Sequence, residues 1–149
     1  MTTIFILSLA GAVISAAVGT FWYSNKTPMG RLHMTYLGFD KLSPEEQQQK
    51  IALGKSMMGK MYAGQLALSF LTSFATVFII VESVRNQVPF LLAAGFVVFN
   101  WLCFMVPSVG GQVLWGNVDR SIAWKKFFSD ITSSLITLLL IALMTSFFV

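Results

Sequence analysis

The chain alternates between long apolar runs and hydrophilic connections. Four runs, at about residues 4–23, 61–81, 88–106 and 127–149, are separated by three connections that carry most of the charged residues. An α-helix needs roughly 20 apolar residues to cross about 30 Å of hydrocarbon, and each run has about that length. The pattern predicts an all-α integral membrane protein whose four transmembrane helices form an antiparallel bundle, as one domain over residues 1–149.

The third run does not end at a clear boundary. The sequence from Asn86 to Val118 is uncharged and too long for one simple crossing, and Pro107 and the pair Gly110-Gly111 interrupt it. Either a helix kinked at the proline continues to Trp115, or an interfacial loop follows residue 106. A kink is tolerated where neighbouring helices cover the carbonyl group that proline leaves free. We expect the kinked helix.

The first connection, residues 25–60, contains a strong signal for the start of a helix. Ser43 is suited to cap the helix, Pro44 to its first position, and Glu46 to complete a capping box with Ser43. The residues that follow are mainly polar and basic as far as Lys60. The segment is therefore predicted to be an amphipathic helix on the membrane surface or an extension of the second transmembrane helix into water.

Positive charge is concentrated in two of the connections. Nine of the ten Lys and Arg residues lie in the first and third: Lys26, Arg31, Lys41, Lys50, Lys55, Lys60, Arg120, Lys125 and Lys126. Alternate connections share one side of a membrane, and the side rich in Lys and Arg is the cytoplasmic one. We expect connections 25–60 and 119–126 in the cytoplasm and both termini outside, in a bacterial inner membrane. The expected partners are anionic lipid headgroups and not nucleic acid.

Composition limits the chemistry that the chain can support. Only 11% of the residues are charged, whereas about 25% is usual for a soluble domain. The single cysteine, Cys103, excludes an intrachain disulfide and a cysteine-rich metal site. His33 is the only histidine and is expected to be exposed in a loop, and zinc would need more ligands. We expect no metal and no cofactor.

Polar side chains inside the runs are the first candidates for ligand binding. Gln65 lies in the second run, and Asn100, Trp101 and Gln112 lie in or just after the third. An amide in hydrocarbon needs a hydrogen-bond partner, which is usually a side chain of another helix. The alternative is a polar ligand site lined by these residues. No acid or base occupies the centre of a run, which counts against a proton-driven transporter.

A stripe of small residues marks the first run. Gly11, Ser15 and Gly19 recur at a spacing of four, which places them on one face of a helix and lets two backbones approach closely. The stripe is interpreted as a surface for packing within the bundle, with a dimer interface as the alternative.

A second candidate site lies at the expected cytoplasmic interface. Trp22, Trp115, Asp119 and Arg120 should all approach it. Tryptophan prefers this level of the membrane, and arginine offers a planar set of donors to an anionic headgroup or a small acid. The alternative is that these residues only anchor the helices, with Asp119 and Arg120 as a surface ion pair. The sequence contains no recognisable motif of catalytic residues.

Two segments carry a family resemblance. One is Phe21-Trp22-Tyr23-Ser24, followed by a basic loop with Pro28 and Gly30; the other runs from Trp101 to Pro107 and continues with Leu114-Trp115 and Arg120-Ser121. In these segments the chain resembles domain-of-unknown-function family 1761. It differs at Asn25, where a proline is expected, and at Gly116-Asn117, where a shorter and more acidic turn is expected. The resemblance implies a bacterial protein with four transmembrane helices and implies no activity.

These observations leave three classes of function. The leading hypothesis is binding or transport of a small or lipid-like molecule within the helix bundle. The alternative is a structural or accessory membrane subunit, possible also as a homo-oligomer. A membrane enzyme that acts at the cytoplasmic interface through His33, Asp119 or Asp130 is the least favoured.

Overall fold

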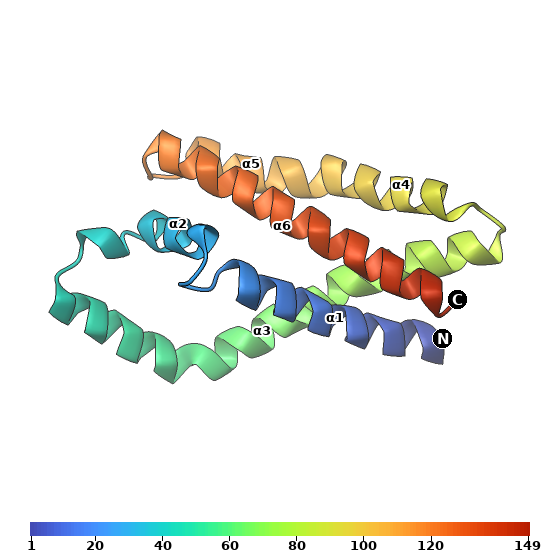
Figure 1. The fold of residues 1–149 in the computed structure, drawn as a ribbon, viewed down its shortest axis with the longest axis horizontal. Helices are drawn as coiled ribbons and strands as arrows, with labels where there is room; N and C mark the ends of the chain where they lie inside the picture. The colour runs from blue at the N-terminus through green and yellow to red at the C-terminus, as the bar shows by residue number, and fades with distance from the viewer.

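The fold is an assembly of long helices, seen in a computed structural model that describes residues 1–149 except the side chain of Ser56 (Figure 1). The elements in chain order are α1 (Thr2–Trp22), α2 (Pro28–Tyr36), η1 (Phe39–Lys41), α3 (Pro44–Arg85), α4 (Phe90–Asn100), η2 (Trp101–Met105), α5 (Val106–Trp115) and α6 (Arg120–Phe147). Four stretches of the described chain are long and apolar enough to cross a membrane, namely Thr2–Trp22, Met57–Arg85, Phe90–Trp115 and Arg120–Phe147. The predicted all-α class with four packed apolar helices is confirmed, and the chain is a multi-pass membrane protein.

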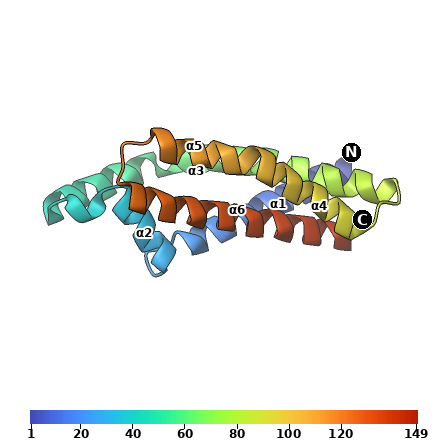
Figure 2. The same cartoon turned by 90° about the horizontal axis from the view of Figure 1, so that it is seen from above.

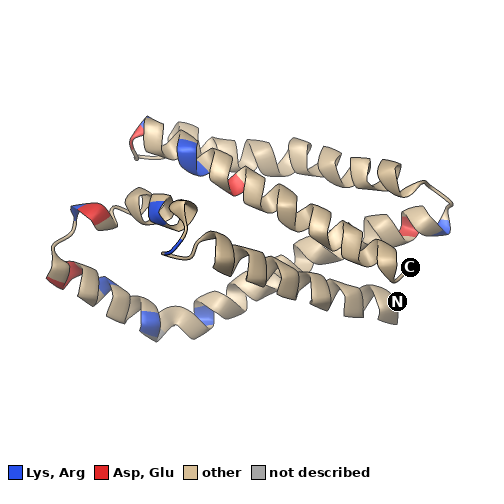
Figure 3. Ribbon diagram, in the orientation of Figure 1, with Lys and Arg blue, Asp and Glu red and all other residues tan. Residues whose placement is uncertain are grey.

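The helices run antiparallel, so alternate connections lie at the same end. Both views place the two termini and the turn between α3 and α4 at one end, and α2 and the turn between α5 and α6 at the other (Figure 1; Figure 2). Figure 3 shows most of the blue Lys and Arg segments toward this second end. Arg85, which pairs with Glu82, is the last residue of α3 and precedes the turn at the first end. The fold therefore gathers the basic connections, as the sequence pattern predicts.

The first connection ends in a helix that continues without a break into the second span. Ser43 Oγ accepts a hydrogen bond from Glu46 N at 3.3 Å, and Glu46 Oε2 accepts one from Ser43 N at 2.8 Å, which completes the predicted capping box. From this start α3 runs for 42 residues. Of the two expected arrangements, the structure has the extension of the second span, which projects beyond the end of α1 (Figure 1).

The third span is helical as far as Trp115, which excludes the interfacial loop. The segment before Pro107 is a π-helix, η2. A proline has no N–H and its ring collides with the carbonyl group four residues earlier, which here belongs to Cys103 inside η2. A local π-turn is a common way to absorb such a collision without ending a helix.

The fourth helix begins earlier than predicted. A start at residue 127 was expected from hydrophobicity, but α6 begins at Arg120. Asp119 accepts hydrogen bonds from the backbone N–H groups of Ser121 and Ile122 at 2.9 and 3.2 Å. These bonds satisfy N–H groups that the first turn leaves free, so the basic segment that follows is helical instead of forming a connection.

The core forms around α6. The described side chains make three clusters of buried hydrophobic residues, and α6 contributes to each through Ile141, through Leu138 and Ala142, and through Ala123 and Phe127. Two buried hydroxyls on α6 bond back to their own helix: Thr137 Oγ1 donates to Ser133 O and Thr145 Oγ1 donates to Ile141 O, both at 2.8 Å. A hydroxyl that is satisfied within its own helix can face a neighbouring helix at little cost.

The small-residue stripe of α1 faces α3 along part of its length. A Cβ atom at Gly11 would lie 1.9 Å from Ser73 Oγ and 3.1 Å from Ile141 Cγ2. Ser15 Oγ donates to Ser69 Oγ at 3.1 Å. Gly19 is different, because a Cβ atom there would meet nothing within 4 Å. Close approach of α1 and α3 therefore depends on Gly11.

Gly11→Ala should destabilise the bundle, because the added methyl group overlaps Ser73 Oγ and, even with that hydroxyl rotated away, lies only 3.1 Å from Ser73 Cβ and Ile141 Cγ2. We expect a loss of about 1–3 kcal/mol in the free energy of unfolding, the usual cost of overpacking. Gly19→Ala is the matched control, and it should leave stability unchanged or slightly higher because alanine favours a helix more than glycine does. Denaturant titration of both purified variants in the same detergent measures the difference. Equal effects of the two substitutions would contradict the proposed packing.

Candidate functional site

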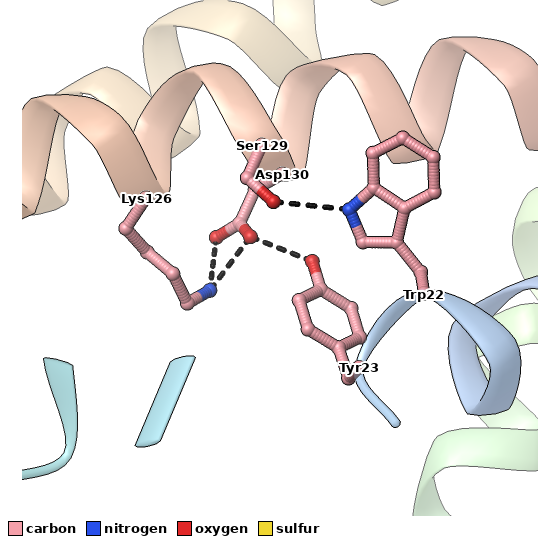
Figure 4. A network of polar contacts seen from close by, with 5 residues as sticks. All are labelled: Trp22, Tyr23, Lys126, Ser129 and Asp130. Atoms are coloured by element: carbon pink, nitrogen blue, oxygen red, sulfur yellow. Dashed lines mark hydrogen bonds and ion pairs between the residues drawn. The ribbon is translucent and has the colours of Figure 1, made fainter. Parts of the chain in front are cut away.

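Polar side chains from α1, α2 and α6 meet near the basic end of the bundle. Tyr23 Oη donates to Asp130 Oδ1 at 2.6 Å, and Lys126 Nζ donates to Oδ1 and Oδ2 of Asp130 at 2.6 and 2.5 Å. Trp22 Nε1 donates to Ser129 Oγ at 3.0 Å (Figure 4). These residues, together with His33 and Tyr36 of α2, are called the polar junction below.

Helical spacing explains why α6 supplies three members of the polar junction. Lys126 and Asp130 are four residues apart, which places both on one face of α6. Their side chains are only 13% and 21% exposed, so the ion pair is shielded from water. Trp22 and Tyr23 come from the end of α1. The carboxylate of Asp130 therefore holds that end against α6.

The turn between α1 and α2 sets the position of α2. Thr27 Oγ1 donates to the carbonyl oxygens of Trp22 and Ser24 at 2.7 and 2.9 Å, and it accepts a hydrogen bond from Gly30 N at 2.9 Å. A Cβ atom at Gly30 would lie 2.0 Å from Ser24 O. Glycine is needed at this position because the first turn of α2 lies directly on the backbone of the preceding turn.

Aromatic rings of α1 and α2 enclose the Lys126 ammonium group. Lys126 Nζ lies 5.2 Å from the ring centre of Tyr23 and 5.5 Å from that of Tyr36, within the range of a cation–π interaction. The His33 ring lies 5.1 Å from the Tyr23 ring. Lys126 is thus surrounded by two rings and a carboxylate, and these contacts join α2 to α6.

His33 and Tyr23 both have shifted pKa values. Burial lowers the pKa of His33, the positive charge of Lys126 lowers it further, and the charge of Asp130 opposes the shift. His33 Nδ1 is buried and has no hydrogen-bond partner among the described residues. Burial, the hydrogen bond to Asp130 and the charge of Asp130 raise the pKa of Tyr23. Tyr23 is therefore a protonated donor at neutral pH, and the His33 ring is favoured in its neutral form.

A groove of about 550 Å³ opens beside the polar junction, between the end of α1, α2 and α6. Its lining residues are Trp22, Pro28, Met29, Leu32, Lys125, Phe128, Ser129 and Thr132. Lys125 is the one charged side chain in this lining, and it has no ion-pair partner among the described residues. We call this space the interfacial groove. It combines apolar walls with one cation.

The four residues predicted at the interface have different contacts in the structure. Trp22 belongs to both the polar junction and the interfacial groove. Trp115 is 90% exposed at the end of α5, and Asp119 is the cap of α6. Arg120 is exposed and makes no ion pair with Asp119 among the described contacts. Asp119 Oδ1 accepts hydrogen bonds from the backbone N–H groups of Ser121 and Ile122 at the start of α6, where the helix dipole favours a negative charge.

Of the predicted residues within the spans, only Asn100 and Trp101 line a common space. Gln65 Nε2 donates to Ser69 Oγ at 3.4 Å on its own helix. Trp101 Nε1 donates to Ser134 Oγ of α6 at 2.9 Å, and Asn100 Nδ2 donates to Phe96 O at 2.9 Å. The bond between helices that was expected of Asn100 is therefore made by its neighbour Trp101.

Two smaller spaces lie beside these polar residues. Asn100 and Trp101 line a groove of about 230 Å³ between α3 and the third span, together with Thr72 and Thr76. Gln112 lines a separate cavity of about 30 Å³ against the polar junction, which has room for roughly one water molecule.

The sequence interpretation missed most of the polar junction. It placed His33 in an exposed loop, but His33 is half-buried on α2. It assigned Asp130 to the first turn of the fourth helix, but α6 begins ten residues earlier, at Arg120. The spacing of Lys126 and Asp130 on an apolar helix was a usable signal. The Tyr23 side chain contacts both His33 and Asp130, whereas Asp119 is at the start of α6. The three residues proposed for an enzyme therefore do not form one site.

Comparison with known proteins adds no assignment. No protein-family model matches the chain, and neither a curated protein nor a solved structure matches it. The resemblance to domain-of-unknown-function family 1761 stays a prediction. Among the described residues, no three or more His, Cys, Asp and Glu side chains are grouped so as to hold a metal ion.

Acidification should loosen the polar junction through His33. Because the pKa of His33 is lowered, the folded protein binds a proton at this ring less readily than the unfolded chain does. The stabilisation is complete above about pH 6.5, the ordinary histidine value, and decreases as the pH falls from there toward the lowered pKa. We expect the apparent melting temperature in detergent to fall over this range. The variant His33→Gln has no titrating ring at this position, so its melting temperature should depend less on pH. An equal dependence in both proteins would refute the assignment of this effect to His33.

Proposed function

We propose that this membrane protein binds an anionic lipid-like molecule in the interfacial groove. The observation that carries the proposal is the combination of a groove of about 550 Å³ with apolar walls and one unpaired ammonium group, that of Lys125. Ligand sites in proteins are usually of about 300–1,000 Å³, largely apolar, with a few polar groups that fix the orientation. The groove fits this description for part of a lipid.

The position of the groove along the bundle supports an amphiphile over a water-soluble ligand. The groove lies where the first span ends at Trp22, an indole that favours the headgroup level. Met29, Leu32 and Phe128 offer apolar contact to an acyl chain, and Lys125 offers its charge to a phosphate or carboxylate. Lys126 is occupied by Asp130. The neighbouring lysine is therefore the one available to a ligand.

The proposed orientation places the groove at the cytoplasmic face of a bacterial inner membrane, with both termini outside. Nine of the ten Lys and Arg residues belong to the two connections at the end where the groove lies. Basic residues favour the cytoplasmic side because they are retained there during insertion. The anionic lipids of that leaflet are then in direct reach of the groove.

Removal of the Lys125 charge should weaken binding of anionic lipid. We expect Lys125→Gln to reduce the affinity for fluorescent phosphatidylglycerol about fivefold, since one lysine near an anionic surface contributes about 1 kcal/mol. Affinity for the phosphatidylcholine analogue should not change. The measurement uses the purified full chain in a neutral detergent.

Two further variants make this measurement specific. Lys50→Gln removes the same charge on the projecting part of α3, outside the groove, and should leave the affinity unchanged. Leu32→Trp should fill the groove and weaken the binding of both lipids. If Lys125→Gln and Lys50→Gln behave alike, binding at the interfacial groove is wrong.

Orientation is tested by labelling single cysteines in intact cells, in a Cys103→Ser background. Asn86→Cys lies in the turn between α3 and α4, and Gln48→Cys lies on the projecting part of α3. A membrane-impermeant maleimide added from outside should label the first variant and not the second. Labelling in permeabilised cells checks that both sites are reactive, and the reverse pattern would overturn the orientation.

A further inference from the structure

The third span carries an amide near the middle of the membrane. Asn100 is ten residues after Phe90, where the span begins. At about 1.5 Å per residue this is roughly 15 Å along the helix, which is about half of the 30 Å hydrocarbon thickness. Asn100 is exposed on the surface of the bundle. Its carboxamide therefore faces the hydrocarbon at the depth where water and headgroups are farthest away.

Most of the hydrogen-bonding capacity of this amide is unused. Its one hydrogen bond within the described chain is the bond from Nδ2 to Phe96 O. A carboxamide has two donors and an acceptor oxygen, so one donor and the oxygen have no partner. An unsatisfied polar group in hydrocarbon costs on the order of several kcal/mol. A partner from outside the described chain would remove this cost.

Lipid of the surrounding bilayer does not supply such a partner. The polar groups of a phospholipid lie at the headgroup level, about 15 Å from the middle of the hydrocarbon. Acyl chains offer no hydrogen bond. The groove beside Asn100 is also lined by Thr72, Thr76 and Trp101. Their donors are already bonded to Leu68 O, Thr72 O and Ser134 Oγ, so among the described residues this lining offers no free donor to the Asn100 oxygen. The missing partner must itself be a polar group held at the same depth.

We propose that two copies of this chain associate through the third span and that their Asn100 side chains hydrogen-bond to each other. Copies inserted with the same orientation place this residue at the same depth. A carboxamide is both donor and acceptor, so two amides related by a two-fold axis along the membrane normal satisfy each other. Amide pairing of this kind is an established force in the association of membrane helices.

The surface around Asn100 is suited to this contact. The third span has the lowest buried share of the four, 11% against 28%, 33% and 39%. The groove of about 230 Å³ next to Asn100 has the small side chains of Thr72 and Ala75 on its α3 side. Small residues let a second helix approach closely. Phe96 and Phe104, which are exposed near Asn100, are large enough to fill such a space on the opposing copy.

Oxidative cross-linking in native membranes tests this contact. Phe96 is four residues before Asn100 and therefore lies on the same helical face. In a Cys103→Ser background, Phe96→Cys should form a disulfide-linked dimer. Leu102→Cys is the matched control, because Leu102 is also exposed on this span but lies about half a turn away from Asn100. This control should remain monomeric.

The amide itself is tested in the cross-linking background. Adding Asn100→Leu should reduce the dimer product at least fivefold, and Asn100→Gln should restore it. Melting profiles in detergent check that each variant is folded. Cross-linking that is unaffected by Asn100→Leu, or equal at Phe96 and Leu102, overturns the pairing. A protein that stays monomeric in every variant also overturns it and indicates a small polar molecule as the partner of Asn100.

Discussion

The arrangement of the basic end depends on a single carboxylate that must be neutralised near the hydrocarbon boundary. Asp130 faces Lys126 on its own helix and Tyr23 at the end of α1. A partly buried charge is costly unless opposite charge and hydrogen bonds compensate it, so these partners hold the helix ends in place. The same cluster encloses Lys126 between rings of α1 and α2. The interfacial groove exists because α2 is held here and does not lie free on the membrane.

In the membrane-spanning part of the bundle, the hydrophobic effect does not drive the helices together, because the lipid tails are as apolar as the helix surfaces. Association must then come from close packing and from polar contacts. Gly11 against Ser73 allows the backbones of α1 and α3 to approach, and Trp101 joins the third span to Ser134 of α6. Helix α6 contributes to every described core cluster. It is the common surface against which the other spans are placed.

The sequence predicted what depends on local pattern. Run length and charge identified the spans, and the capping box at Ser43 identified the start of α3. It did not predict where α6 begins, because hydrophobicity ignores the cap that Asp119 provides. It did not assemble the polar junction either. Tyr23 and Asp130 are 107 residues apart. Their contact depends on how α1 packs against α6, and the hydrophobic pattern along a single helix does not determine that packing.

Two polar side chains, Lys125 and Asn100, point to different interactions. At the basic end, Trp22, Tyr23, Lys126 and Asp130 bond to one another or to Ser129, whereas Lys125 at the groove has no ion-pair partner among the described residues. Headgroups and water can reach Lys125, so it suits a ligand that comes from the lipid surface. Asn100 is unsatisfied where neither is in reach, so its partner must be carried to that depth by another membrane-embedded structure. The two proposed partners, a lipid at the interface and the third span of a second copy at the midplane, therefore differ in their depth in the bilayer.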